Sequence, residues 1–375
     1  MEKVDITIIG AGIIGLSVAA EVSKLNNSVY LVERHDSFGQ ETSSRNSEVV
    51  HAGIYYSPGS LKAKTCVEGN RLIYEICAEN NIPYRKSGKL IIANTGEEIR
   101  ELENLFRNAG NNGVSGLEII TNGQIKKIEP NVKAKAALYS ASTGIVDIHS
   151  LMKHFAAQAQ SNGTLIAYGV EVTSIDRAND RYRLKVRDVD GDELYFQSRI
   201  VINCAGLESD IIASMVGIDV KQQGYELKYC KGQYFRMSAA KSKLINRLIY
   251  PVPESGAGLG IHATPDISGS VRLGPDDKYI SRKEVDYGVN EACRKKFYDS
   301  AVKFLPFLKP DYLVPDTAGI RPKLQAEGEG FRDFVIKEES GLGFPGFINL
   351  IGIESPGLTS APAIGRYVRR IVEDL

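Results

Sequence analysis

The chain has 375 residues, of which 43% are hydrophobic and 25% are charged, as expected of a globular protein with a substantial core. This composition excludes the disordered, collagen-like and coiled-coil classes. Lysine plus arginine and aspartate plus glutamate both number 46. No overall charge therefore favours nucleic acid or an anionic membrane, and the expected partner is a small molecule.

The first 34 residues have the pattern of a βαβ unit. A β-branched run predicts a strand over 4–9, a glycine turn follows at 10–15, and a helix over 16–25 leads to a second strand over 28–32. Acidic Glu2 and Asp5 precede the apolar run over 6–20, and three glycines interrupt it, which argues against a signal peptide.

Two further features of the sequence bear on its location. No apolar run reaches the roughly 18 residues of a membrane span, so no integral membrane segment is expected. The five cysteines are scattered without a C-x-x-C pair, which indicates a reducing compartment. We therefore expect a cytoplasmic protein, and peripheral membrane contact stays open.

The remaining elements follow from hydrophobic periodicity. Helices are expected where apolar residues recur every three or four positions, at 61–80, 97–109, 151–161, 289–305 and 359–373. Strands are expected at 89–93, 164–168, 171–176, 181–188, 193–197, 200–204 and 346–352. The continuous apolar run at 200–204 is typical of a buried parallel strand. Alternating polar and apolar residues over 224–288 predict antiparallel sheet.

A glycine motif, Gly10-Ala11-Gly12-Ile13-Ile14-Gly15, joins the first strand to the first helix. Glycines permit this tight turn and let backbone N–H groups approach a pyrophosphate at the positive end of the helix. Glu33 ends the second strand, 18 residues after Gly15, where a carboxylate can accept hydrogen bonds from a ribose hydroxyl. The pattern predicts a dinucleotide site, and FAD and NAD share it.

Three more segments resemble those of the D-amino-acid oxidase-like superfamily of FAD enzymes, namely residues 41–47, 203–206 and 354–359. The resemblance implies FAD rather than NAD. In such enzymes these segments line the diphosphate and ribityl path, the phosphate region and the flavin pyrimidine edge. The implied cofactor-binding residues are Gly10, Gly12, Ile14, Gly15, Glu33, Arg34, Thr42, Ser43, Ser44, His51, Gly53, Val172, Ala205, Gly206, Gly319, Arg321, Ser355, Pro356, Gly357, Leu358 and Thr359.

A narrower resemblance covers nearly the whole chain, through residues 51–56, 231–234, 250–253, 319–323 and 355–359. These segments resemble the L-2-hydroxyglutarate dehydrogenase/oxidase family, a relative of the FAD-dependent glycerol-3-phosphate oxidases. The resemblance implies an α/β fold, in which an FAD-binding Rossmann-like domain carries an inserted α+β substrate domain built on an antiparallel sheet. The expected FAD-binding segments are 1–82, 146–224 and 317–375, and the substrate domain comprises 83–145 and 225–316.

The implied reaction oxidises L-2-hydroxyglutarate to 2-oxoglutarate by hydride transfer to flavin N5. Such a reaction needs a base for the hydroxyl proton, and His51 titrates in the useful range, unless it is a structural histidine. The guanidinium of Arg321 offers a planar fork for a carboxylate, and Lys323 could bind a second anionic end, with a solvated loop as the alternative. Second-rank substrate-binding candidates are Tyr56, Tyr250, His262 and Ser355, for which core or structural roles stay open.

Several alternatives share these features. Glycerol 3-phosphate is the nearest alternative substrate, an amine or amino-acid oxidase is the third, and a flavin-binding module without turnover is a different class. The electron acceptor could be oxygen, a quinone or another flavoprotein, and covalent flavin attachment stays open. Neither H-E-x-x-H nor a Cys/His cluster is present, so no metal is expected. The dispersed basic residues predict no nucleic-acid partner.

Overall fold

A computed structural model of the chain describes residues 1–25, 27–253 and 260–375. The chain forms two compact units. Unit 1 comprises Met1–Ser44, Ile148–Tyr229 and Arg321–Leu375, and unit 2 comprises Arg45–Asp147 and Cys230–Ile320. The sequence assigns residues 45–82 to the FAD-binding domain, whereas they pack with unit 2. The reason is that Val49 and Ile54 are buried in an apolar cluster with the sheet of that unit.

Unit 1 contains an eight-stranded sheet with the order β10-β11-β12-β1-β2-β9, in which β20 pairs with β12 and β19 with β20. Its strands are β1 (Glu2–Ile9), β2 (Val29–Glu33), β9 (Leu165–Tyr168), β10 (Glu171–Ala178), β11 (Arg181–Arg187), β12 (Glu193–Asn203), β19 (Val335–Glu339) and β20 (Phe344–Ile351). The central strands β20, β12, β1, β2 and β9 pair in parallel. The mixed α/β fold expected from the sequence is confirmed.

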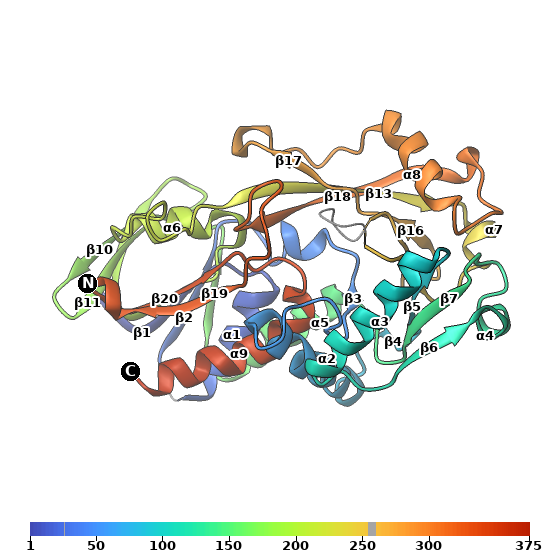
Figure 1. Cartoon of the computed structure of the whole chain (residues 1–375). Coiled ribbons are helices and arrows are strands. Elements are labelled where there is room, and N and C mark those ends of the chain that lie inside the picture. Colours follow the sequence, from blue (N-terminus) through green and yellow to red (C-terminus); the bar gives the residue numbers. More distant parts are fainter. Residues whose placement is uncertain (26, 254–259) are drawn as a thin grey trace. The chain divides into compact units, whose positions relative to one another are not determined.

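Helices α1 (Ile13–Val22), α5 (Ile148–Ser161) and α9 (Gly357–Glu373) pack together beside this sheet (Figure 1). Unit 1 also contains α6 (Ser209–Met215), which contacts β10, β12 and β20. The axes of α1 and α9 approach closely because Gly365 has no side chain, and a Cβ there would lie 2.7 Å from the carbonyl oxygen of Ser17.

Three predicted elements differ from the structure, namely two strands and one helix. The strands expected at 193–197 and 200–204 form one strand, β12, because β1 pairs with it from Phe196 to Asn203 and so spans the expected break. The helix expected over 289–305 is shorter, α8 (Arg294–Ala301). Its start is delayed because the Asn290 side chain accepts a hydrogen bond from the backbone of Ala292 and caps a 3-10 turn. Pro306 disfavours helical backbone at the residue before it.

Unit 2 holds most of a nine-stranded sheet with the order β17-β13-β16-β15-β14-β5-β7-β6, in which β18 pairs with β13. Its strands are β5 (Lys89–Ala93), β6 (Leu117–Thr121), β7 (Ala136–Ser140), β13 (Lys228–Met237), β14 (Leu248–Pro251), β15 (Ala263–Pro265), β16 (Val271–Leu273), β17 (Lys278–Ile280) and β18 (Leu313–Lys323). The pairs β14-β15, β15-β16 and β13-β16 are antiparallel, as the alternation over 224–288 predicts. A three-stranded sheet consists of β3 (Val49–Val50), β4 (Tyr84–Arg85) and β8 (Gly144–Val146).

The helices of unit 2 are α2 (Leu61–Glu79), α3 (Gly96–Asn111), α4 (Asn122–Ile128), α7 (Ala239–Ser242) and α8. Alternation along β5 divides its side chains between two apolar clusters. Leu90 and Ile92 belong to a cluster with α8, whereas Ile91 and Ala93 belong to one with α3 and residues 49–54. Lys89 is therefore on the second face. Among the helices that the structure describes, none has the length and apolar character needed to cross a membrane.

Candidate active site

The predicted glycine turn between β1 and α1 is present in unit 1. Gly10 has a φ of +102°, which other residues rarely adopt, and a Cβ on it would lie 2.6 Å from the carbonyl oxygen of Cys204. A Cβ on Gly15 would lie 1.9 Å from the carbonyl oxygen of Gly10. The close packing of turn, strand and helix therefore requires glycine at both positions.

Glu33 lies at the end of β2 and is bonded to this turn. Its Oε2 atom accepts a hydrogen bond of 2.7 Å from the backbone N–H of Ala11, and its Oε1 atom accepts one of 3.0 Å from His35. The Oγ atom of Ser43 accepts a hydrogen bond of 2.9 Å from the backbone N–H of Ile13, at the start of α1. A glycine-rich turn, a helix N-terminus and a fixed carboxylate fit the diphosphate and ribose of FAD.

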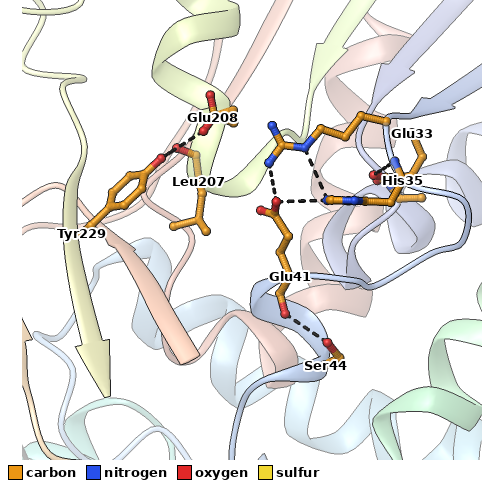
Figure 2. A network of polar contacts seen from close by, with 9 residues as sticks. Glu33, His35, Glu41, Ser44, Leu207, Glu208 and Tyr229 are labelled. Atoms are coloured by element: carbon orange, nitrogen blue, oxygen red, sulfur yellow. Dashed lines mark hydrogen bonds and ion pairs between the residues drawn. The ribbon is translucent and has the colours of Figure 1, made fainter. Parts of the chain in front are cut away.

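The segment after β2 is held by ionic contacts. Arg34 forms an ion pair with Glu41, and the His35 Nε2 atom lies 3.1 Å from Glu41 Oε1. The hydroxyl of Ser44 donates to the backbone carbonyl of Glu41, so Glu41 joins both ends of the segment (Figure 2). Burial lowers the pKa of Arg34, but the Glu41 carboxylate outweighs it and the net shift is upward. Thr42 and Ser44 share the same 3-10 turn as Ser43.

Two further cofactor candidates follow β12. The Asn203 side chain donates to the carbonyl of Ser209 at 2.7 Å and to Asn349 Oδ1 at 2.9 Å. Its own Oδ1 accepts a bond of 3.3 Å from the backbone of Ala205, and Gly206 has a φ of +55°. The chain after Gly206 is held by Tyr229, whose hydroxyl donates to the carbonyl of Leu207 (Figure 2).

Val172 lies near the start of β10. The strand is joined to β2 just before this residue, where the backbone N–H of Val170 donates to the carbonyl of Glu33 at 2.8 Å. Gly319 lies in β18, and a Cβ there would lie 2.0 Å from the carbonyl oxygen of Arg45. Glycine is therefore required at position 319 because the backbone of Arg45 packs against it.

The segment 355–359 leads into α9. The helix begins at Gly357, so Gly357, Leu358 and Thr359 form its first turn, and Ser355 and Pro356 precede it. Pro356 occupies the N-cap position, and its side chain makes no capping hydrogen bond. Backbone N–H groups at such a terminus favour an electron-rich partner.

Lys323 has a different partner from the predicted substrate. Its ammonium lies 3.1 and 3.2 Å from the two carboxylate oxygens of Glu354, and both side chains are largely buried. This ion pair joins the end of β18 to the turn before α9. Lys323 is therefore better explained as support for that turn. Arg321, two residues earlier in β18, is half-buried, with a buried Nε atom.

His51 follows β3 in unit 2. Its backbone carbonyl accepts hydrogen bonds from the Asn70 side chain at 2.9 Å and from the Cys66 thiol at 3.6 Å, both from α2. Gly53 has a φ of +99°, so the chain turns sharply after His51. His51 is half-buried as a residue, and its Nδ1 atom is buried.

A lysine lies beside His51 in what we call the Lys89 cluster, which consists of His51, Tyr55, Lys89, Tyr250 and His262. The Lys89 ammonium lies 4.6 Å from the ring centre of Tyr55 and 4.8 Å from that of Tyr250. Tyr250 stacks on His262, with 3.7 Å between ring centres. His262 Nδ1 lies 2.9 Å from the carbonyl oxygen of Gly260. The exposed fraction of Lys89 is 1%.

Burial determines the protonation of this cluster. It lowers the pKa of Lys89 from 10.5 to about 7. Burial, with a smaller contribution from the Lys89 and His262 charges, lowers the pKa of His51 to about 3. The His51 imidazole is therefore neutral at pH 7, as a proton acceptor must be. An anion beside Lys89 would offset the positive charge and raise both pKa values.

Several predicted side chains come together in unit 2, namely His51, Tyr250 and His262. The backbone carbonyl of Tyr56 accepts hydrogen bonds from the side chains of Asn108 and Asn112. Sequence reasoning missed Lys89 and Tyr55. The available signal was a lysine directly before the apolar run 90–93, since a strand buried on both faces would bury that lysine too.

Comparisons with known proteins agree with these features. Residues 5–371 match a family model described as DAO, FAD dependent oxidoreductase. The chain is 39% identical to a mitochondrial L-2-hydroxyglutarate dehydrogenase of Arabidopsis thaliana, over 98% of this chain and 83% of the relative. It is 33% identical to a glycerol 3-phosphate dehydrogenase of Caloramator mitchellensis, over 99% and 74%. The structure resembles that of FAD-bound L-alpha-glycerophosphate oxidase from Mycoplasma pneumoniae, with a TM-score of 0.87 and 28% identity over 100% and 95% of the two chains.

Proposed function

This chain belongs to the DAO family of FAD dependent oxidoreductases, and from that premise we propose that it oxidises L-2-hydroxyglutarate to 2-oxoglutarate. The neutral imidazole of His51, whose Nδ1 atom is buried, carries the reaction class, because alcohol oxidation needs a proton acceptor. The substrate rests on the likeness over 98% of the chain to an L-2-hydroxyglutarate dehydrogenase.

The glycine turn, Glu33 and Ser43 would hold the dinucleotide part of FAD, and the first turn of α9 would contact the ring. When bound, FAD supplies the acceptor for the hydride that leaves C2 of the substrate. The fixed Glu33 carboxylate would accept hydrogen bonds from the ribose. The N-terminus of α9 would favour negative charge on its ligand.

His51 would take the proton of the C2 hydroxyl, so that C2 becomes a carbonyl carbon. The planar guanidinium of Arg321 would bind a substrate carboxylate through two parallel hydrogen bonds. Tyr250 and His262 would shape the side of the site next to His51, since they stack on each other there. Reoxidation of the enzyme after each turnover needs an electron acceptor. Oxygen, a quinone and another flavoprotein are the candidates.

Glycerol 3-phosphate is the second candidate substrate. It is favoured by the glycerol 3-phosphate dehydrogenase relative and by the similarity to the glycerophosphate oxidase structure. In that reaction the same base would act on a secondary alcohol, and the cationic groups would bind phosphate instead of carboxylate. A simple amine would not need the cationic groups, whereas an amino acid would use one of them for its carboxylate.

A substrate panel tests the proposal. Purified enzyme is assayed with a dye as electron acceptor and with L-2-hydroxyglutarate, its D-enantiomer and glycerol 3-phosphate in turn. We expect turnover of the L-enantiomer, with kcat/KM at least about 100-fold above that of the other two. A preference for glycerol 3-phosphate would overturn the proposed substrate, and it would leave the reaction class intact. Parallel assays with oxygen and with a soluble quinone identify the acceptor.

A further inference from the structure

Lys89 is a buried amine without an anionic partner. Within residues 1–25, 27–253 and 260–375, its ammonium has no ion pair and no hydrogen bond, and its contacts are the two tyrosine rings. Cation–π contacts of this kind are worth about 0.5–2 kcal/mol each. Taking an ammonium out of water costs several kcal/mol, so the rings alone do not compensate for its burial.

The groups around Lys89 add no negative charge at neutral pH. His51 and His262 are bases, and burial raises the pKa of the thiol of Cys66 and of the phenols of Tyr55 and Tyr250, so that all three stay protonated. The neighbouring strand residues Leu248 and Ser140, which pair with Lys89, are uncharged. A cation in such surroundings favours an anionic ligand.

A second polar group of the cluster points to the same ligand. The Tyr55 hydroxyl is buried and has no hydrogen-bond partner in the part of the chain that the structure describes. Leaving a buried hydroxyl unsatisfied costs about 1–3 kcal/mol, and such groups in folded proteins usually have a partner. An ammonium and a hydroxyl donor from one cluster match the two oxygens of a carboxylate.

We propose that Lys89 and the Tyr55 hydroxyl bind a carboxylate of the anionic substrate. This inference rests on the proposed function, which it deepens by assigning a second cationic contact besides Arg321. It also replaces Lys323, whose charge is already paired with Glu354.

Substrate binding then affects the base as well. The positive charge of Lys89 contributes to the low pKa of His51. A carboxylate bound to Lys89 offsets that charge, so the imidazole becomes a better proton acceptor when substrate is present. A neutral alcohol would bind without this effect.

The test uses the FAD-loaded enzyme and binding of 2-oxoglutarate, measured by the change in flavin absorbance and by the ligand-induced rise in melting temperature. Lys89→Met keeps the length of the side chain and removes its charge. We expect its Kd to rise about 10- to 100-fold, since a charge-assisted hydrogen bond is lost. Tyr55→Phe should raise Kd about 3- to 10-fold. Lys86→Met is the matched control, because Lys86 lies 4.1 Å from the ring centre of Tyr74 but is exposed.

The outcomes separate the two proposals. An unchanged Kd for Lys89→Met, in an enzyme whose wild type is reduced by L-2-hydroxyglutarate, would overturn the role of Lys89 and leave the proposed function intact. A wild type that L-2-hydroxyglutarate does not reduce would overturn the function itself. If Lys89→Met does not fold, Lys89→Arg replaces it, and we expect this variant to retain binding within about 10-fold because it keeps the charge. Loss of carboxylate binding on Tyr55→Phe alone would assign the site to the hydroxyl instead.

Discussion

The side chain of Asn70 donates a hydrogen bond of 2.9 Å to the backbone carbonyl of His51, and a second of 3.0 Å to that of Ser142. One residue of α2 thereby ties the loop that carries His51 to the loop that precedes β8. Because both acceptors are backbone atoms, these two hydrogen bonds do not depend on the His51 side chain. The imidazole can therefore be replaced without removing what holds the loop.

His51→Gln should slow reduction of the flavin by substrate about 100- to 10,000-fold, the usual contribution of a general base. The measurement is single-turnover mixing in an anaerobic stopped-flow instrument, at saturating L-2-hydroxyglutarate. His154→Gln is the control, since His154 lies in α5 of unit 1 and is half-buried. If His51→Gln reduces its flavin at the wild-type rate, another group takes the proton.

Gly15→Ala should reduce FAD content and lower the free energy of unfolding by about 1–3 kcal/mol. Its Cβ would lie 1.9 Å from the carbonyl oxygen of Gly10, so the turn and α1 must separate. Gly96→Ala is the matched control, because a Cβ at this helical position meets nothing within 4 Å. Flavin absorbance per protein and thermal unfolding measure both effects. Full FAD content in Gly15→Ala would contradict the role of this turn in cofactor binding.

Lys323→Met should destabilise the protein by about 3–5 kcal/mol, because it removes the ammonium that pairs with the largely buried Glu354 carboxylate. The double variant Lys323→Met/Glu354→Gln removes both charges and should recover most of that loss. Denaturant unfolding of the two variants gives the comparison. If Lys323→Met instead keeps its stability and raises only KM, Lys323 binds substrate as the sequence predicts.

The burial of Lys89 predicts a pH dependence of stability. Its pKa is about 7 in the folded protein and 10.5 as the unperturbed value, so between these pH values the unfolded state binds more protons. The cost of burying the ammonium is thus fully present below pH 7 and decreases as the pH rises towards 10.5. Without ligand, Lys89→Met should be more stable than wild type at pH 6, and this gain should shrink by pH 9. A gain that does not change with pH would exclude titration of Lys89 in this range.

Sequence patterns predict the βαβ unit well because its signals are local. The strand, the glycines and Glu33 lie within one short stretch of sequence. The glycines permit the close backbone packing of the turn, and Glu33 accepts a hydrogen bond from it. Local patterns fail where distant pairing or capping decides the element. The strand β12 continues across residues 198 and 199 because of pairing with β1, and α8 starts late because of Asn290.

The candidate site is harder to predict from the sequence. His51 follows from its motif, whereas Lys89 is a single lysine among many. Its importance appears only when β14 brings Tyr250 beside β5 and the loop after β3 brings Tyr55. The pairing of Lys323 with Glu354 likewise depends on residues 31 positions apart. Such contacts depend on the tertiary fold and have no local pattern.

The most direct test of the central claim is an anaerobic titration of the purified protein, with the oxidised flavin band as the readout. We predict that L-2-hydroxyglutarate bleaches this band, while the D-enantiomer and glycerol 3-phosphate leave it unchanged at equal concentration. Bleaching by glycerol 3-phosphate alone, or a protein that binds no flavin, would contradict the account.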